Sequence, residues 1–164
     1  MDTQDYRNFF GQLPTGVTAI VAKASSGPVG LVVGTFSSVS LDPPLISFMV
    51  TKGSRSWAAV RAEGRFTANI LASDQRRLSQ TLSGWSVDKF RNVMFDEGKA
   101  HILRGCLAWA DCIFEREVEA GDHTIVLATP CELAVERDTK PLVFFQRAYH
   151  RTLSVEDGRG PGWV

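Results

Sequence analysis

Two long strand-like segments joined by four residues restrict the fold of this chain more than any other feature. Residues 106–118 and 123–136 contain many β-branched and aromatic side chains, and only "EAGD" lies between them. A connection this short joins antiparallel strands. The two segments therefore predict a long β-hairpin.

Shorter elements are predicted along the rest of the chain. Apolar runs bounded by Gly, Pro or Ser indicate strands at 17–23, 30–40, 44–50, 65–71 and 141–145. Apolar residues three and four positions apart indicate short helices at 3–11, 54–64 and 73–82. Thr3 and Ser73 are candidate N-caps, and Gly64 and Gly84 are candidate helix stops. Residues 85–104 are expected to form an irregular polar connection.

The order of these elements indicates the fold class. The strands do not alternate regularly with helices, so a parallel doubly wound sheet is not expected. A mainly β fold, an antiparallel barrel that is closed or nearly closed and carries short helices, agrees better with the order. The length of 164 residues favours one domain. We place this domain at residues 1–153, followed by a loose, Gly-rich tail at 154–164.

Composition and charge exclude several classes of protein. Lys and Arg together number 18, as do Asp and Glu, so no basic excess predicts nucleic-acid binding. The apolar runs are far shorter than the roughly 18 residues of a membrane span. The N-terminal "MDTQDYRNFF" is acidic and aromatic, unlike a signal peptide. We therefore expect a cytoplasmic protein.

The three cysteines predict neither a disulfide nor a metal site. Cys106 and Cys112 would lie about 20 Å apart on one strand, at roughly 3.3 Å per residue, which is too far for a disulfide. Their spacing to Cys131 is not a zinc pattern, and the three histidines show no ligand spacing. We expect buried, reduced thiols and no bound metal.

Small polar residues occupy the end of the predicted strand at 30–40, just before the rigid turn "DPP". Gly34 lies inside this strand, where a glycine often marks a bulge or the close approach of a ligand. The backbone and hydroxyl groups of Val33, Thr35 and Ser37 could hold a flat heteroaromatic ring. The alternative is a barrel-corner glycine beside surface serines.

The segment "TKGSRSW" at 51–57 combines several groups suited to an anion. It follows a predicted strand and opens a helix, whose free N–H groups and dipole favour a negative ligand. Ser54 and Ser56 add hydroxyl donors, and Lys52 and Arg55 add positive charge. A plain serine N-cap beside solvated side chains is the alternative. The segment is not a Walker A loop, and no GxGxxG motif follows a strand.

Three other stretches could contribute to a binding site. His123 begins a predicted strand beside a Gly-Asp turn, where the mouth of a barrel could lie. Lys89 offers a charge and Phe90 a stacking face, and Tyr149 could line a pocket with one phenylalanine of "FF" at 144–145. Each has a structural alternative as a turn, surface or core residue. No catalytic triad or carboxylate pair is apparent, so a cofactor would carry any chemistry.

Taken together, these stretches resemble the short-chain flavin reductases that supply reduced flavin to two-component monooxygenases. The resemblance covers about residues 6–153. It rests on segments in a fixed order: "FFGQLPTGVTAIVA" (9–22), "GLVVGTFSSVSLDPPLISF" (30–48), "TKGSRSW" (51–57), "GRFTANIL" (64–71), "DKF" (88–90), "LAWADC" (107–112), "GDHTIVL" (121–127) and "PLVFFQRAY" (141–149).

The resemblance implies a split-barrel flavin-binding fold and a homodimer with its flavin sites near the subunit interface. It implies hydride transfer from NADH or NADPH to FMN or FAD, after which the reduced flavin diffuses to a partner oxygenase. A flavin-binding module of the same fold without significant reductase turnover is the alternative, because fold alone does not settle function.

The resemblance also implies roles for individual residues. The isoalloxazine ring would lie on Val33, Gly34, Thr35, Phe36 and Ser37, with Ser40 nearby. The ribityl chain and phosphate would lie on Thr51, Lys52, Gly53, Ser54, Arg55 and Ser56, and the distal part of the flavin on Lys89 and Phe90. His123, the candidate catalytic residue, would shape the nicotinamide side together with Phe145 and Tyr149.

Two places differ from the family pattern. Gly34 and Thr35 stand where many members have a polar residue and a serine, which removes one side-chain contact to the ring edge. Gln146 and Arg147 stand where the family usually has Arg-Gly before the last tyrosine. The second difference leaves the choice between NADH and NADPH open.

Overall fold

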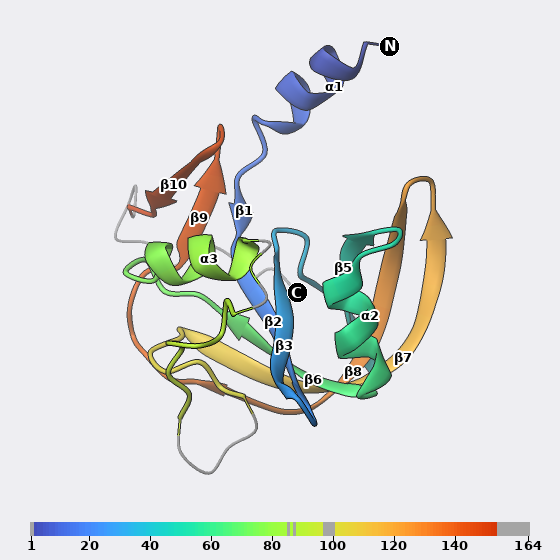
Figure 1. The fold of residues 1–164 in the computed structure, drawn as a ribbon. Coiled ribbons are helices and arrows are strands. Elements are labelled where there is room, and N and C mark those ends of the chain that lie inside the picture. The colour runs from blue at the N-terminus through green and yellow to red at the C-terminus, as the bar shows by residue number, and fades with distance from the viewer. Residues whose placement is uncertain (1, 85, 87, 97–100, 154–164) are drawn as a thin grey trace.

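A seven-stranded antiparallel sheet is the centre of the molecule, as seen in a computed structural model that describes residues 2–84, 86, 88–96 and 101–153 (Figure 1). The strands are β2 (Thr18–Ala24), β3 (Gly27–Val33), β4 (Ser37–Leu41), β5 (Pro44–Thr51), β6 (Arg65–Ile70), β7 (Ala108–Ala120) and β8 (His123–Val135). Their order is β3-β2-β6-β7-β8-β5-β4. The prediction of a mainly β, antiparallel fold is confirmed.

The hydrogen-bonded ladder of this sheet is open. Among the strands that the structure describes, β3 and β4 are the two edges, and each pairs with one neighbour. The pairing of the described strands therefore does not close a barrel, and the split barrel stays a prediction. The predicted tail at 154–164 and part of the connection at 85–104 lie outside the described residues.

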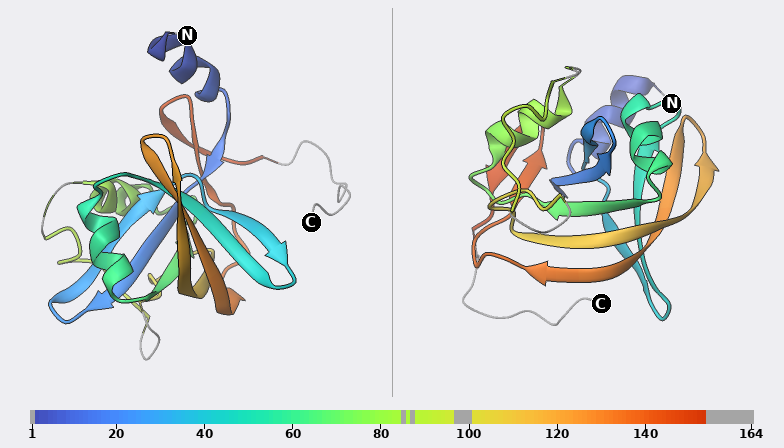
Figure 2. Two further views of the ribbon diagram at one scale, coloured as in Figure 1. Left: turned by 90° about the vertical axis from the view of Figure 1, so that its right-hand side faces the viewer. Right: turned by 60° about the horizontal axis from the view of Figure 1, so that its bottom comes forward.

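The long hairpin predicted from "EAGD" is present as β7 and β8. The two strands pair from Ala120 opposite His123 to Ala108 opposite Val135, with two register shifts along the way. Gly121 forms the turn in the left-handed region, at a φ of 63°. The hairpin curves strongly along its length (Figure 2), which brings β5 beside β8 at one end and β6 beside β7 at the other.

A second, three-stranded sheet has the order β1-β9-β10. It consists of β1 (Thr15–Gly16), β9 (Leu142–Phe145) and β10 (Ala148–Arg151). The sequence did not predict β10, because its turn lacks the usual glycine. Gln146 and Arg147 both adopt positive φ, 47° and 63°, as the two central residues of a type I′ hairpin do. The expected family glycine would thus fall on a left-handed position that Arg147 occupies here.

Three short helices complete the fold: α1 (Thr3–Phe10), α2 (Arg55–Ala62) and α3 (Arg76–Ser83). Ser54 caps α2, and Gly64 follows it at a φ of 66°. Two predicted caps were wrong. Asp2, not Thr3, caps α1 through the N–H of Gln4. Ser73 does not cap α3, because the helix starts only at Arg76 and Gln75 occupies the N-cap position.

The strand predicted at 30–40 is interrupted, which corrects the prediction. β3 ends at Val33 and β4 begins at Ser37. Between them the Thr35 Oγ1 accepts a hydrogen bond from the Met49 N–H at 2.8 Å. A Cβ added to Gly34 would lie 2.9 Å from Thr15 Oγ1. The glycine is therefore needed for a close contact within the chain.

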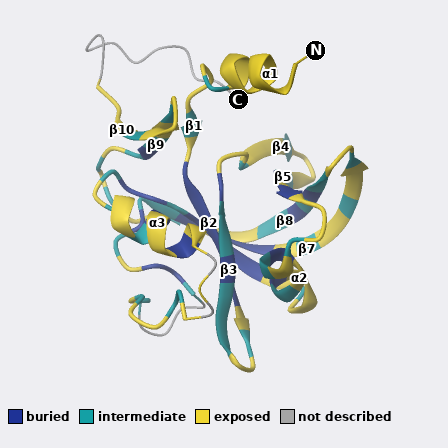
Figure 3. Ribbon diagram, turned by 45° about the horizontal axis from the view of Figure 1, so that its top comes forward, coloured by how far each residue is buried: buried dark blue, intermediate teal, exposed yellow. Residues whose placement is uncertain are grey.

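Two clusters of buried side chains make up the core, as Figure 3 shows for the central strands. In one, Phe48 packs edge-on against Trp57 and Phe66 with ring centroids 5.3 and 5.6 Å apart. The other joins β2 to residues of α3, β9 and the segment at 102–109. By contrast, α1 is exposed along its whole length. No helix in the described parts of the chain has the length and apolar character that crossing a bilayer requires.

All three cysteines are free, as predicted, but only two are buried. Burial raises the pKa of Cys106 to about 11 and the pKa of Cys112 to about 12. Cys131 is exposed, because it sits at a register shift of the β7–β8 pair. The expectation of buried thiols was therefore wrong for Cys131.

Candidate functional site

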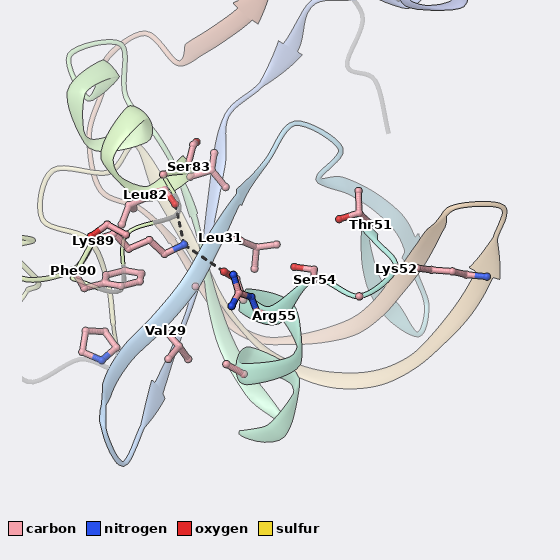
Figure 4. A pocket seen from close by; sticks show the side chains of 18 residues that line it. Val29, Leu31, Thr51, Lys52, Ser54, Arg55, Leu82, Ser83, Lys89 and Phe90 are labelled. Carbon is pink, nitrogen blue, oxygen red and sulfur yellow. Dashed lines mark hydrogen bonds between the residues drawn. The ribbon is translucent and has the colours of Figure 1, made fainter. Parts of the chain in front are cut away.

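A cavity of about 700 Å³ lies between the edge strand β3, the start of α2 and the end of α3 (Figure 4). This volume is in the usual range for small-molecule and cofactor pockets. The cavity is lined by Pro28, Val29, Gly30, Leu31, Val32, Thr51, Lys52, Gly53, Ser54, Arg55, Ser56, Ala59, Leu82, Ser83, Gly84, Ser86, Lys89 and Phe90. The structure thus brings two predicted groups of site residues, 51–56 and 89–90, to one place.

The loop before α2 presents hydroxyl and cationic groups to this cavity. Gly53 has a φ of 79°, which turns the chain sharply between β5 and the helix. The Ser54 Oγ accepts the Trp57 N–H at 3.2 Å, so this hydroxyl is also the helix cap. Lys52 points away from the cavity (Figure 4) and pairs with Glu119 at 3.1 Å. Arg55 and Ser56 are therefore the more direct candidates for an anion.

Lys89 reaches into the cavity from the opposite side. Its Nζ donates to Leu82 O at 3.0 Å, at the end of α3, and lies 3.5 Å from the Ser56 Oγ at the start of α2. Partial burial lowers the pKa of Lys89, because a desolvated ammonium is less favourable. A bound anion would restore a counter-charge to this lysine.

The floor of the cavity comes from residues 28–32 of β3, which the sequence did not single out for binding. Because β3 is an edge strand, one side of its backbone has no strand partner among the described elements. Those N–H and C=O groups can meet a ligand. The sequence feature that could have indicated this floor is Gly30, a glycine inside a strand. A Cβ added there would lie 2.3 Å from Ile20 O and 3.1 Å from Phe90 Cζ.

The predicted ring site at 33–37 and Ser40 does not line the cavity. The Thr35 hydroxyl is engaged by Met49, and the Ser37 Oγ donates to Ser38 O at 3.1 Å. Phe36 packs, partly buried, against one core cluster. A role of these residues in holding a ring stays a prediction.

His123 lies beside the loop that opens α2. It starts β8 directly opposite Thr51, and the Lys52 N–H donates to Asp122 O at 3.0 Å. The His123 Nδ1 is 2.7 Å from the Asp122 Oδ1, and this contact lowers the pKa of the Asp122 carboxyl. A neighbouring carboxylate fixes the imidazole orientation and leaves the Nε2 for another partner.

Phe145 and Tyr149 lie elsewhere in the chain, in the second sheet. The Tyr149 hydroxyl is 3.0 Å from the Ser79 Oγ, and its ring packs on Phe144. Phe145 contacts His150. Tyr149 lines a separate hollow of about 430 Å³. Neither residue lines the main cavity, so one chain does not assemble the whole predicted nicotinamide side there.

The antiparallel sheet and the cavity lined by Arg55 and Lys89 define a mainly β protein with a pocket of positive charge. A family model described as the flavin reductase like domain matches residues 10–153. The chain therefore belongs to the flavin reductase like domain family.

Individual relatives agree with this assignment. The chain is 36% identical over 152 residues to a flavin reductase of Pseudomonas putida, covering 91% of this chain and 89% of that protein. It is also 36% identical over 152 residues to the FMN reductase (NADH) SmoA of Agrobacterium fabrum, covering 92% and 86%.

Solved structures share the fold. Nitrilotriacetate monooxygenase component B of Mycobacterium thermoresistibile matches with a TM-score of 0.89 and 35% identity, over 99% of this chain and 93% of that chain. The NADH:FAD oxidoreductase SgcE6 of Streptomyces globisporus, in complex with NAD and FAD fragments, matches with a TM-score of 0.87 and 30% identity, over 95% and 96%.

Proposed function

We propose that this protein oxidises NADH, or NADPH, by hydride transfer to FMN or FAD and supplies the reduced flavin to a separate monooxygenase. The observation that carries the proposal is the cavity in which Ser56, Arg55 and Lys89 converge beside an open strand edge. Relatives named as flavin reductases and as a monooxygenase component support it.

The residues of the cavity fit a flavin phosphate. Arg55 provides a planar guanidinium and Lys89 an ammonium, both suited to phosphate oxygens. The open edge of β3 offers backbone groups to the polar edge of a ring. When bound, the flavin supplies the hydride acceptor. The protein contributes positioning and charge balance, which account for much of the rate gain when two reactants are held in contact.

We place the hydride donor near His123, because this residue stands at the Thr51 end of the cavity. Its ring is held by Asp122, so the free imidazole nitrogen can hydrogen-bond to the carboxamide of a nicotinamide. Phe145 and Tyr149 could reach this point only from a second copy of the chain. We infer a homodimer, which the exposed Tyr6, Phe9 and Phe144 also favour.

Replacing His123 by alanine should weaken the use of NADH without weakening the binding of oxidised flavin. We expect the NADH KM to rise by roughly tenfold, or kcat to fall to a similar extent, because one positioning hydrogen bond is lost. The Kd for oxidised flavin, measured by fluorescence titration, should change by less than about twofold. Leu133→Ala, an exposed residue farther along β8, is the control. A large loss of flavin binding in His123→Ala would assign this residue to the flavin instead.

Flavin binding should depend on pH through Lys89. A bound phosphate favours the protonated lysine, so affinity is greatest below the lowered pKa of Lys89 and falls as the pH rises through it. In Lys89→Arg the charge persists at all these pH values, and the decrease should disappear. Lys89→Ala should weaken binding by roughly tenfold at neutral pH. Equal pH profiles for the wild type and Lys89→Arg would exclude Lys89 as the phosphate ligand.

The deciding experiment follows absorbance at 340 nm with NADH or NADPH, and with FMN or FAD, under air. Flavin-dependent oxidation supports the reductase, and the four rates identify the preferred pair. Flavin that stays bound through gel filtration without turnover would favour a flavin-binding module instead. We further propose that the two sheets form a split barrel and that the enzyme acts in the cytoplasm.

A further inference from the structure

A hollow of about 430 Å³ lies between the start of α3 and the hairpin of β9 and β10 (Figure 1). The Tyr149 hydroxyl, 3.0 Å from the Ser79 Oγ, connects β10 to α3 at this place. The hollow is lined by Ser73, Asp74, Arg76, Arg77, Leu142, Tyr149, His150 and Arg151. Three of these residues are arginines, and we refer to the space as the arginine hollow.

The arginine hollow carries an excess of positive charge. Among the described residues that line it, Asp74 is the one carboxylate, and Arg137 already pairs with it at 2.8 and 3.1 Å. This pairing lowers the pKa of Asp74, so the carboxylate stays ionised and engaged. Within the part of the chain that the structure describes, Arg76, Arg77 and Arg151 form no ion pair. Three guanidinium groups therefore border one hollow with their charge unbalanced.

The stability of α3 does not explain the position of Arg76 and Arg77. They occupy the first turn of this helix, where the positive end of the helix dipole disfavours cations. That turn has no acidic residue, and Gln75 at the N-cap position makes no capping hydrogen bond with its side chain. Two arginines placed against the dipole indicate a role in binding an anion.

The donors of the arginine hollow suit an anion with many oxygens. Each guanidinium is a planar fork of five N–H donors and can bind two oxygens of a phosphate at once. Three such forks offer more donors than one carboxylate, with about four acceptor sites, can use. Ser73 and His150 add further hydrogen-bonding groups. A diphosphate group matches this set of donors and this charge better than a single carboxylate does.

The arginine hollow is separate from the main cavity. Arg76 and Arg77 at the start of α3 line the hollow, whereas Leu82 and Ser83 at its end line the cavity. Eight residues at roughly 1.5 Å each place these ends about 10 Å apart. In the described part of the chain, no residue lines both spaces. One diphosphate group therefore cannot occupy both.

We propose that the arginine hollow is a second anion site, which binds a diphosphate group either as the free ion or as part of a nucleotide. Arg76 and Arg77 hold the group from α3, and Arg151 holds it from β10. This assignment goes beyond the proposed function, because it requires no ligand in the main cavity.

Calorimetric titration with inorganic pyrophosphate tests the site, on protein kept in excess FMN so that the main cavity is filled. Arg76→Gln/Arg151→Gln should raise the pyrophosphate Kd by at least roughly tenfold, because two charge-assisted contacts are lost. Arg7→Gln/Arg116→Gln is the matched control, since it removes the same charge from two exposed arginines outside the hollow. It should change this Kd by less than about twofold. Equal Kd values in the two double variants, or no binding to the wild type, would overturn the proposal.

Thermal denaturation without ligand separates binding from folding. Arg76→Gln should unfold at the wild-type temperature or above it, because a cation is removed from the first turn of α3. A clearly lower Tm would assign this arginine to the fold and contradict the proposal.

ADP in place of pyrophosphate identifies the source of the diphosphate. Tighter binding of ADP would support a nucleotide as the ligand, and tighter binding of pyrophosphate would support the free ion. In either case the affinity must depend on Arg76 and Arg151. Pyrophosphate binding that depends on these arginines, in a protein that binds no FMN, would support this inference and refute the proposed reductase function.

Discussion

The Gly30→Ala variant should unfold at a temperature about 10 °C lower than the wild type. An added Cβ would lie 2.3 Å from Ile20 O and 3.2 Å from the Val21 Cα, both in the backbone of β2. Backbone cannot rotate away as a side chain can, so β2 and β3 must separate. We expect a loss of about 3 kcal/mol, at the upper end for overpacking, and such a loss shifts Tm by about 2–4 °C per kcal/mol in a chain of this size.

The same substitution should also impair flavin binding. The new methyl group would stand 3.1 Å from Phe90 Cζ, which forces this ring away from its position in the cavity wall. Thermal denaturation and fluorescence titration at 10 °C separate the two effects. Gly16→Ala is the matched control, since no atom lies within 4 Å of its added Cβ. Unfolding of both variants at the wild-type temperature would contradict the strand spacing described here.

The Asn69→Ala variant should lower the free energy of unfolding by about 3 kcal/mol. Asn69 is fully buried on β6, and its Oδ1 accepts the Leu103 N–H at 2.8 Å. Its Nδ2 lies within 3.3 Å of the carbonyl oxygens of Ala19 and His101. Removing the amide leaves the buried Leu103 N–H without its acceptor, at about 1–3 kcal/mol, and opens a small cavity.

This asparagine also fastens the chain at 101–103 to the sheet, so local opening should accompany the loss of stability. Urea denaturation gives the free energy, and limited proteolysis should show earlier cleavage near His101 than in the wild type. Asn92→Ala is the control, because Asn92 is exposed in the preceding connection. Equal protease sensitivity of the two variants would show that other contacts hold this segment.

Local signals in the sequence were sufficient for much of the fold. The hairpin of β7 and β8 follows from two apolar segments and one Gly-containing turn. The helix α2 follows from three residues that are close together in the sequence. Ser54 caps the helix, Trp57 is buried in the core and Gly64 follows the helix end. These elements are specified by neighbours in sequence, so sequence patterns predict them.

Elements that depend on distant contacts were missed or misplaced. The break at 34–36 is set by Thr35 bonding to Met49 on another strand. The backbone N–H of Ser73 pairs with Lys140 O, and α3 starts only at Arg76. The type I′ turn at Gln146 and Arg147 contains no glycine, so the sequence does not indicate it. Each outcome requires the strand order, which a single sequence does not contain.

The candidate site was predicted in part for the same reason. The anion loop at 51–56 and Lys89 carry charge and hydroxyl groups that indicate binding by composition alone. The floor at 28–32 is recognisable only once β3 is known to be an edge strand. Contact of residues 33–37 with a flavin ring stays a prediction, since these residues do not line the cavity.

The open edge of β3 has a consequence for the protein when it is empty. An unpaired strand edge is a template on which another chain can add a strand, and proteins usually protect such edges. Here the molecule bound in the cavity would itself cover the edge between Pro28 and Val32. In the proposed reaction reduced flavin leaves after each turnover, so the protein that has just released it would be the form most prone to self-association. The concentration of free flavin in the cell would then govern the colloidal stability of the enzyme as well as its rate.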